Sequence, residues 1–147
     1  MSIGDYIFGL CKSLTNIEIP DSVKSIGNYA FDGCSSLTNI VISNSVKSIG
    51  YRAFNECDSL TSVTIPNSVK SIGDDAFMRC KSLKTIEIPN SVTSIGRYAF
   101  YRCNELTSII YKGTKKQALT KLKVKDKEWR AGSSISKIIC NDEVIEL

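Results

Sequence analysis

Apolar residues recur along most of the chain at a fixed spacing of 23 residues. Leucines, cysteines, Ile-Gly pairs and Ala-Phe pairs all return at this interval. The leucines of the series are Leu14, Leu37, Leu60, Leu83 and Leu106. A period of roughly 20–50 residues is the sequence signature of a repeat architecture, in which each repeat forms one small structural unit. The pattern therefore predicts a stack of similar units.

One repeat contains two extended segments and one compact turn. At residues 63–65 apolar and polar side chains alternate, which predicts a short strand with one buried face. Pro66 has no N–H group to donate and is expected to end that strand. Residues 69–72 form a second extended segment, and Gly73 permits a corner in the backbone. Residues 74–80 carry apolar side chains at helical spacing, which favours a short α or 3₁₀ turn.

A unit of this size cannot bury its own apolar face, but stacked units can bury it against one another. We therefore predict an α/β repeat solenoid: a right-handed coil with a parallel β-sheet along one side and short α or 3₁₀ turns. Each row of its core would take one residue from every repeat. The predicted rows begin at Leu14, Ile17, Ile19, Val23, Ile26, Ala30, Phe31 and Cys34.

A different pattern follows once the period ends at Lys112. Residues 115–124 contain helix formers and predict an amphipathic helix. Residues 135–140 and 144–147 predict two short strands. The apolar stripe of the helix consists of Ala118, Leu119 and Leu122.

The C-terminal segment has the length and amphipathicity to cover the end of the solenoid. A terminal repeat exposes core side chains and an unpaired strand edge, so a solenoid needs a cap there. Trp129, the only tryptophan, is expected to pack over the last repeat. We therefore divide the chain into a solenoid at residues 1–111 and an α+β C-terminal cap at residues 112–147.

The repeat has the form Leu-x-x-Ile-x-Ile-Pro-x-Ser-Val-x-x-Ile-Gly-x-x-Ala-Phe-x-x-Cys. It resembles the 23-residue, treponemal-type repeat of the BspA-like leucine-rich-repeat proteins over residues 3–111. The segment from Ile110 to Asp142 is similar to the C-terminal cap that follows these repeats. This resemblance implies a right-handed leucine-rich-repeat coil that binds host or neighbouring-cell proteins or glycans at the cell surface or outside the cell. A spacer segment without a ligand of its own is the alternative.

Catalytic chemistry finds little support in the residues. The chain contains no histidine, the usual general base at neutral pH and a frequent zinc ligand. Its glycines are single and follow the repeat, so they form no glycine-rich phosphate loop. No acid, base and nucleophile form a recognisable combination. The sequence therefore predicts a protein that is not an enzyme and that holds no cofactor or metal.

The cysteines follow the repeat more closely than any redox motif. Five of the six recur at the 23-residue spacing, and none belongs to a Cys-x-x-Cys pair. Stacked strands lie about 4.8 Å apart with parallel Cα–Cβ bonds, which is poor geometry for disulfides. We interpret the five as buried thiols. Cys140 lies outside the series, which leaves open a disulfide between Cys103 and Cys140.

Positive charge is concentrated in one segment. Up to Tyr111, ten basic residues balance ten acidic ones, whereas residues 112–130 contain eight basic residues against Asp126 and Glu128. This segment is either a solvated face of the cap or a docking patch for an acidic partner. The sequence argues against nucleic acid as a partner, because few aromatic residues accompany the lysines. We find neither a membrane-spanning apolar run nor a signal peptide in the sequence.

Positions that vary between repeats are the candidates for binding a partner, because core packing does not constrain them. The last repeat places two arginines and two tyrosines in one turn, and both residue types are enriched at binding hot spots. One earlier repeat carries an Arg-Tyr pair. The candidate partner-binding residues are Arg97, Tyr98, Tyr101, Arg102, Tyr51 and Arg52.

The first residues suggest a second kind of contact. Ile3, Ile7, Phe8 and Leu10 stand in core register without a polar cap before them. Two chains could bury these residues against each other in a homodimer through the N-terminal end. The alternative is a monomer whose first half-turn frays.

Overall fold

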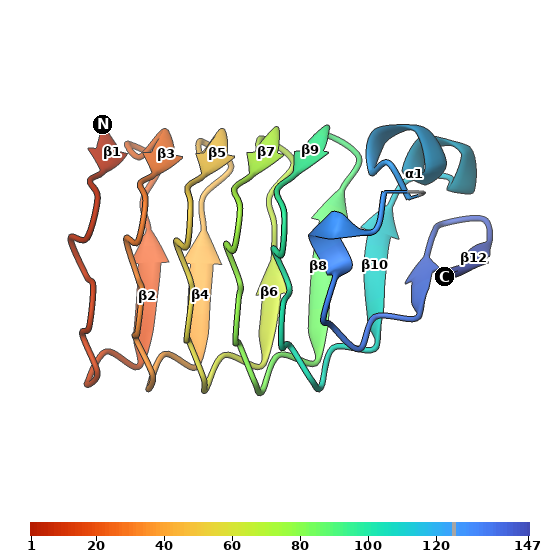
Figure 1. The fold of residues 1–147 in the computed structure, drawn as a ribbon. Helices are drawn as coiled ribbons and strands as arrows, with labels where there is room; N and C mark the ends of the chain where they lie inside the picture. Colours follow the sequence, from red (N-terminus) through yellow and green to blue (C-terminus); the bar gives the residue numbers. More distant parts are fainter. Residues whose placement is uncertain (125) are drawn as a thin grey trace.

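The computed structural model describes residues 1–124 and 126–147, which form a stack of similar rungs (Figure 1). Each rung of the solenoid contributes a longer strand and a two-residue strand. The longer strands are β2 (Asn16–Ile19), β4 (Asn39–Ile42), β6 (Ser62–Thr64), β8 (Thr85–Pro89) and β10 (Ser108–Lys112). The short strands are β1 (Ser2–Ile3), β3 (Ser25–Ile26), β5 (Ser48–Ile49), β7 (Ser71–Ile72) and β9 (Ser94–Ile95).

Both sets of strands pair in parallel with their equivalents in the neighbouring rungs. The short strands form one sheet in the order β1-β3-β5-β7-β9. The longer strands form a pair, β2-β4, and a larger sheet that begins β6-β8-β10. Within the described residues no ladder joins β4 to β6. The predicted parallel sheet is confirmed, and the second extended segment forms a sheet of its own.

The structure differs from the predicted helical turn at residues 74–80, which form hydrogen-bonded turns. The backbone N–H groups of Asp75, Phe77 and Arg79 donate to carbonyl oxygens of the next rung at 2.7–2.9 Å. Asp75 and Arg79 achieve this with φ angles of +55° and +60°. A helix would direct these N–H groups along its own axis. The segment therefore works as a third ladder between rungs, which we call the turn ladder.

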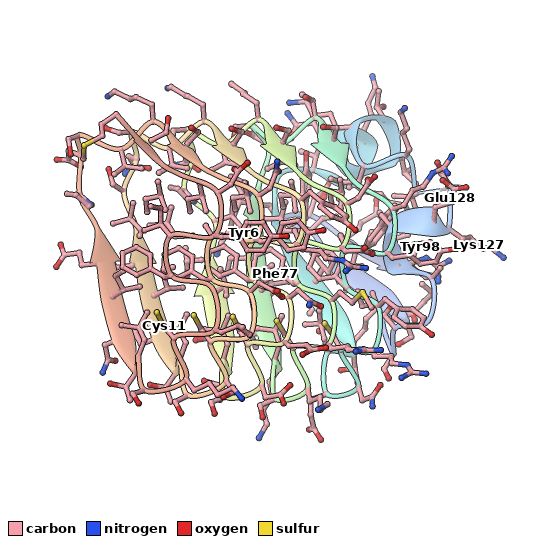
Figure 2. The ribbon with its side chains drawn as sticks, turned by 60° about the vertical axis from the view of Figure 1, so that its left-hand side comes forward. Tyr6, Cys11, Phe77, Tyr98, Lys127 and Glu128 are labelled. Atoms are coloured by element: carbon pink, nitrogen blue, oxygen red, sulfur yellow. The ribbon has the colours of Figure 1, made fainter. Side chains whose placement is uncertain are left out.

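The core consists of continuous rows of one residue type. The rings of Phe31 and Phe54 stack with centroids 5.2 Å apart and planes 1° from parallel. Phe77, labelled in Figure 2, continues the same row. Beside them, the Cys57 thiol donates to the Phe31 carbonyl oxygen at 3.3 Å, and equivalent bonds recur along the stack. The predicted core rows are confirmed, although Leu14, Ile17 and Ile95 are only partly buried. Ile7 and Leu10, which we placed in core register, are exposed in the first rung.

Glycines at one corner let the rungs approach closely. A Cβ atom on Gly73 would lie 2.7 Å from the carbonyl carbon of Gly50, and one on Gly50 would meet Gly27 at the same distance. These values are shorter than any normal contact of a Cβ atom. The glycine row is thus required by the spacing between rungs, whereas the sequence analysis related it only to a corner in the backbone.

The C-terminal segment continues the sheet and covers the last rung. Helix α1 (Lys115–Lys121) begins at a capping box of Thr114 and Gln117. The 3₁₀ turn η1 (Glu128–Arg130) places Trp129 edge-on against Phe100, with centroids 6.1 Å apart. Strand β11 (Lys137–Ile139) pairs in parallel with β10, and β12 (Val144–Glu146) pairs antiparallel with β11.

Most predictions for this segment are confirmed. The predicted helix and both strands are present, although the helix ends at Lys121, three residues earlier than predicted, and Trp129 is buried against the last rung. The predicted apolar stripe of the helix needs one correction: Ala118 and Leu122 are buried, but Leu119 is 45% exposed. Leu119 lies one residue beyond Ala118, so the helical rotation turns it away from the core. Neither helix of the described residues could cross a membrane.

Candidate partner-binding surface

The outward side chains of the turn ladder form the surface that varies most between rungs. In each of the four later rungs, a buried Ala-Phe pair lies between two residues with positive φ angles. We call this surface the turn face. Its two main rows are Tyr6, Tyr29, Arg52, Asp75 and Tyr98, and Leu10, Gly33, Glu56, Arg79 and Arg102.

Tyrosines cover the N-terminal half of the turn face. Tyr6 stacks on Tyr29 with centroids 4.4 Å apart, and Tyr29 meets Tyr51 edge-on at 5.0 Å. The hydrogen bond to Tyr29 and the loss of water around the ring raise the pKa of Tyr51. The Arg52 guanidinium lies over the Tyr51 ring, 5.2 Å from its centroid. These side chains therefore have partners within the chain itself.

Arg52 is held in place from the other side by Asp75. Its Nε donates to the Asp75 carboxylate at 3.1 Å. Partial burial lowers the pKa of Arg52, but the hydrogen bond and the charge of Asp75 outweigh it, so that the pKa is raised. The guanidinium thus keeps its charge and a fixed orientation at the middle of the turn face.

A hollow of about 340 Å³ opens beside this ion pair, and we call it the tyrosine hollow. Its lining consists of Arg52, Asp75, Met78, Tyr98 and Tyr101. The Tyr98 and Tyr101 rings meet edge-on at 5.8 Å, and Tyr98 is 48% exposed. An exposed tyrosine and a partly buried methionine beside an ion pair offer both apolar contact and hydrogen bonding to a ligand.

The six predicted binding residues divide between several places. Arg52, Tyr98 and Tyr101 line the tyrosine hollow, and Tyr51 contacts Arg52 from outside it. Arg97 turns away to the cap, where it pairs with Glu128 at 2.8 Å. Figure 2 shows Tyr98 and Glu128 at this same end of the stack. Arg102 lies over the Tyr101 ring, 5.3 Å from its centroid, and faces a second hollow.

This second hollow, which we call the arginine hollow, has a volume of about 570 Å³. Its lining consists of Glu56, Arg79, Lys81, Arg102 and Asn104. The sequence analysis found only Arg102 among these. A signal was present, however: Glu56, Arg79 and Arg102 follow one another at the repeat spacing, as do Asp58, Lys81 and Asn104. Charged rows at this spacing place the charges of neighbouring rungs side by side.

A groove of about 670 Å³ lies on the opposite side, over the longer strands. It extends from β4 to β10 and crosses the gap between β4 and β6. Its walls are mainly uncharged: Asn39, Val41, Ser62 and Thr64 contribute, and Val41 is 50% exposed. Tyrosine and arginine are absent from its lining. The residue types enriched at binding hot spots therefore gather on the turn face.

Neither the cysteines nor the acidic residues form a reactive centre. Among the described residues, no cluster of three or more His, Cys, Asp or Glu could hold a metal ion. Burial raises the pKa of Cys34 to about 11, which disfavours a reactive thiolate. Cys103 and Cys140 both have free thiols, so the alternative of a disulfide between them is not realised.

Several lysines of the basic segment are engaged within the chain. Lys112 pairs with Glu87 at 3.4 Å, and Lys115 pairs with Glu143 at 2.7 Å. Lys121 donates to the carbonyl oxygen of Asn90 at 2.6 Å. Lys125 also belongs to this segment but lies outside the described residues. These contacts favour the view of the segment as a face of the cap.

Comparison with known proteins decides the family. The model of the BspA type leucine rich repeat region matches residues 1–122 with six copies. The chain belongs to the BspA type leucine-rich-repeat family. Its repeats are non-catalytic, and leucine-rich repeats of this kind typically bind proteins. No curated protein matches the chain.

Three solved structures show the same repeat architecture. The Treponema pallidum leucine-rich repeat protein is 39% identical, with a TM-score of 0.73 over 75% of this chain and 51% of that one. A leucine-rich cell surface protein from Faecalibacterium prausnitzii is 38% identical, with a TM-score of 0.78 over 81% and 31%. A Bacteroides ovatus leucine-rich repeat protein is 30% identical, with a TM-score of 0.74 over 91% and 32%. The chain thus spans between 31% and 51% of the length of these structures.

Proposed function

We propose that the chain is a non-catalytic binding module of a cell-surface or secreted protein. Its partner is a protein or glycan of a host or a neighbouring cell, bound on the turn face. The tyrosine hollow carries this proposal, because it joins an exposed and a partly buried tyrosine ring to an oriented arginine across three consecutive rungs. The similar protein from Faecalibacterium prausnitzii is a cell surface protein, which supports the proposed location.

The turn face is also free of the demands of packing. A leucine-rich repeat fold supplies the same backbone at every rung, so the outward residues can change without disturbing the core. Arg52 comes from one rung, and Tyr98 and Tyr101 come from another rung two repeats later, yet all three meet around one hollow. A ligand that contacts all three residues would bind at one position in the stack, because that combination of residues occurs there.

A structural spacer is the second candidate function. The stacked Tyr6 and Tyr29 rings and the Arg52–Asp75 ion pair favour it, because these side chains satisfy one another without a ligand. The two functions differ in one respect: a spacer needs no exposed hot-spot residue, and Tyr98 is exposed. The predicted homodimer through the N-terminal end stays a prediction alongside both.

A binding screen with a matched pair of variants tests the proposal. The purified chain is exposed to a defined panel of extracellular proteins and glycans, and dissociation constants are measured for each ligand found. We expect Tyr98→Ala to weaken binding at least tenfold, because it removes a hot-spot ring. Tyr6→Ala is the control, since Tyr6 occupies the same row and is 58% exposed at the far end.

Three outcomes would contradict the proposal. Equal losses in both tyrosine variants would show that the tyrosine hollow has no special role. Loss of binding in Thr64→Ala alone would place the ligand in the groove over the longer strands. If the folded chain binds no member of the panel, the spacer function is supported instead.

A further inference from the structure

The basic residues of the turn face are paired with acids, with one exception. Arg52 pairs with Asp75, and Arg97 pairs with Glu128. Arg79 pairs with Glu56 at 2.6 Å, and Lys81 pairs with Asp58 at 3.1 Å. In the part of the chain that the structure describes, Arg102 has no acidic group within 4.0 Å. Its charge is therefore uncompensated at short range.

The order of the rungs explains this surplus. Arg79 finds Glu56 on the preceding rung, but the rung that precedes Arg102 presents Arg79, which has the same charge. On its other side the backbone N–H of Arg102 donates to the carbonyl oxygen of Gly132 at 2.9 Å. Gly132 has no side chain that could neutralise the guanidinium. The charge pairing of this row thus ends one rung before the cap.

The arginine hollow gathers the donors that surround this surplus. Arg79, Lys81 and Arg102 contribute three positive charges, Asn104 contributes an amide, and Glu56 is the one acid of the lining. The Nε atom of Arg79 is buried and has no hydrogen-bond partner. The guanidinium of Arg102 lies over the Tyr101 ring, which restricts its orientation. Cationic donors of this kind suit an oxyanion, and guanidinium groups match its geometry.

We propose that the arginine hollow binds a glycan through a sulfate or carboxylate group, with Arg102 as its principal contact. This inference rests on the proposed function and specifies the ligand chemistry of the turn face. Tyr101 lines the tyrosine hollow and carries Arg102 over its ring, so the two hollows are adjacent. A sugar ring can therefore lie against the tyrosines while its anionic group reaches Arg102. The volume of about 570 Å³ exceeds the needs of a free inorganic anion.

Calorimetric titration of the full chain with four probes tests this proposal. The probes are a sulfated disaccharide, a uronic-acid disaccharide, a neutral disaccharide of the same size and an acidic peptide. We expect the two anionic disaccharides to bind at least tenfold more tightly than the neutral one, and their ratio identifies the preferred oxyanion. Arg102→Gln should abolish that tenfold preference, because it removes the unpaired charge.

A matched control separates a specific site from general electrostatic attraction. Lys70→Gln removes one positive charge from an exposed position next to β7, away from the turn face, and should leave the affinities unchanged. Side-chain NMR adds a direct readout: the Nε–H resonances of Arg79 and Arg102 should shift on titration, whereas that of Arg97 should not. Equal losses in Arg102→Gln and Lys70→Gln would overturn the proposal, as would tighter binding of the acidic peptide than of either glycan.

The remaining outcomes separate this inference from the proposed function. Binding that depends on Tyr98 but is indifferent to Arg102→Gln overturns the anionic site and leaves the binding module intact. If no probe binds and the wider panel yields no ligand that depends on Tyr98, both proposals fail. Circular dichroism of each variant verifies that its fold is retained.

Discussion

The core and the turn face use the same backbone in opposite ways. Along one core row the residue is Phe31, Phe54, Phe77 and Phe100, all fully buried. Along the adjacent turn-face row it is Tyr29, Arg52, Asp75 and Tyr98. The rungs have the same conformation at both rows, so the difference lies in what surrounds each side chain. Packing against two neighbours fixes the core residue, whereas contact with water leaves the outer one free to change.

The comparison also indicates where binding specificity can reside. A change in a core row disturbs the rungs on both sides, because its rings stack at 5.2 Å throughout the middle of the solenoid. A change on the turn face alters one edge of a hollow and little else. The repeat can therefore preserve its fold while the surface acquires features such as the tyrosine and arginine hollows.

The largest expected difference between the two regions is in stability. Phe54→Ala should lower the free energy of unfolding by about 3–5 kcal/mol, because it removes a buried ring between two stacked neighbours. Glu56→Ala, two residues along on the turn face, should lower it by less than about 1 kcal/mol, since its ion pair with Arg79 is substantially exposed. Urea denaturation measures both values. Similar losses would mean that the inward and outward assignments are wrong.

The glycine row sharpens the same contrast within one residue type. Gly73→Ala should lower the free energy of unfolding by about 1–3 kcal/mol, because its new methyl group would overlap the backbone of the preceding rung. Gly4 occupies the equivalent position in the first rung of this chain, where a Cβ atom meets only the Ile7 side chain at 3.3 Å. Gly4→Ala should therefore have a much smaller effect in thermal or urea denaturation. A large loss of stability in both variants would mean that glycine is required for its backbone conformation and not for the close approach of the rungs.

The smallest expected effect concerns the buried thiols. Burial raises the pKa of Cys34 from 9.0 to about 11. The folded thiol keeps its proton to higher pH than the unfolded one, so its stabilising contribution is present below about pH 9 and lost as the pH rises to about 11. Urea denaturation at several pH values should show this decline, and Cys34→Ala should show a shallower one. Identical pH dependence in the two proteins would indicate that the thiol is already exposed to water.

Much of the fold could be predicted because each rung repeats the same sequence pattern. The rows of Leu37, Phe31 and Cys34 identify the core, since residues at a fixed period must occupy equivalent places in a stack. The turn ladder could not be predicted in the same way. Its hydrogen bonds join Asp75 and Arg79 to another rung. The local spacing of apolar residues does not indicate these bonds.

The candidate surface was only partly predictable, for a related reason. Residue type singled out Tyr98, Tyr101 and Arg52, which the structure brings to one hollow. It also singled out Arg97, which is drawn to the cap by Glu128. That acid lies in the non-repeating segment, so no period could indicate the contact. The arginine hollow depends on which charged side chains are left without an oppositely charged partner. Predicting it therefore requires knowledge of the contacts of every neighbouring residue.

The positive φ angles of the turn face lower stability, but they occur at residues whose side chains form the surface that we propose for binding. Tyr98 and Arg102 adopt φ angles of +54° and +59°, a region that glycine occupies more easily than any residue with a side chain. Each such residue carries a strain on the order of 1 kcal/mol. Glycine at both positions would relax the backbone, but it would remove the Tyr98 ring from the tyrosine hollow and the Arg102 guanidinium from the arginine hollow. Selection for thermal stability alone would therefore favour the loss of these side chains. Their retention in a selected variant library would indicate selection for ligand binding.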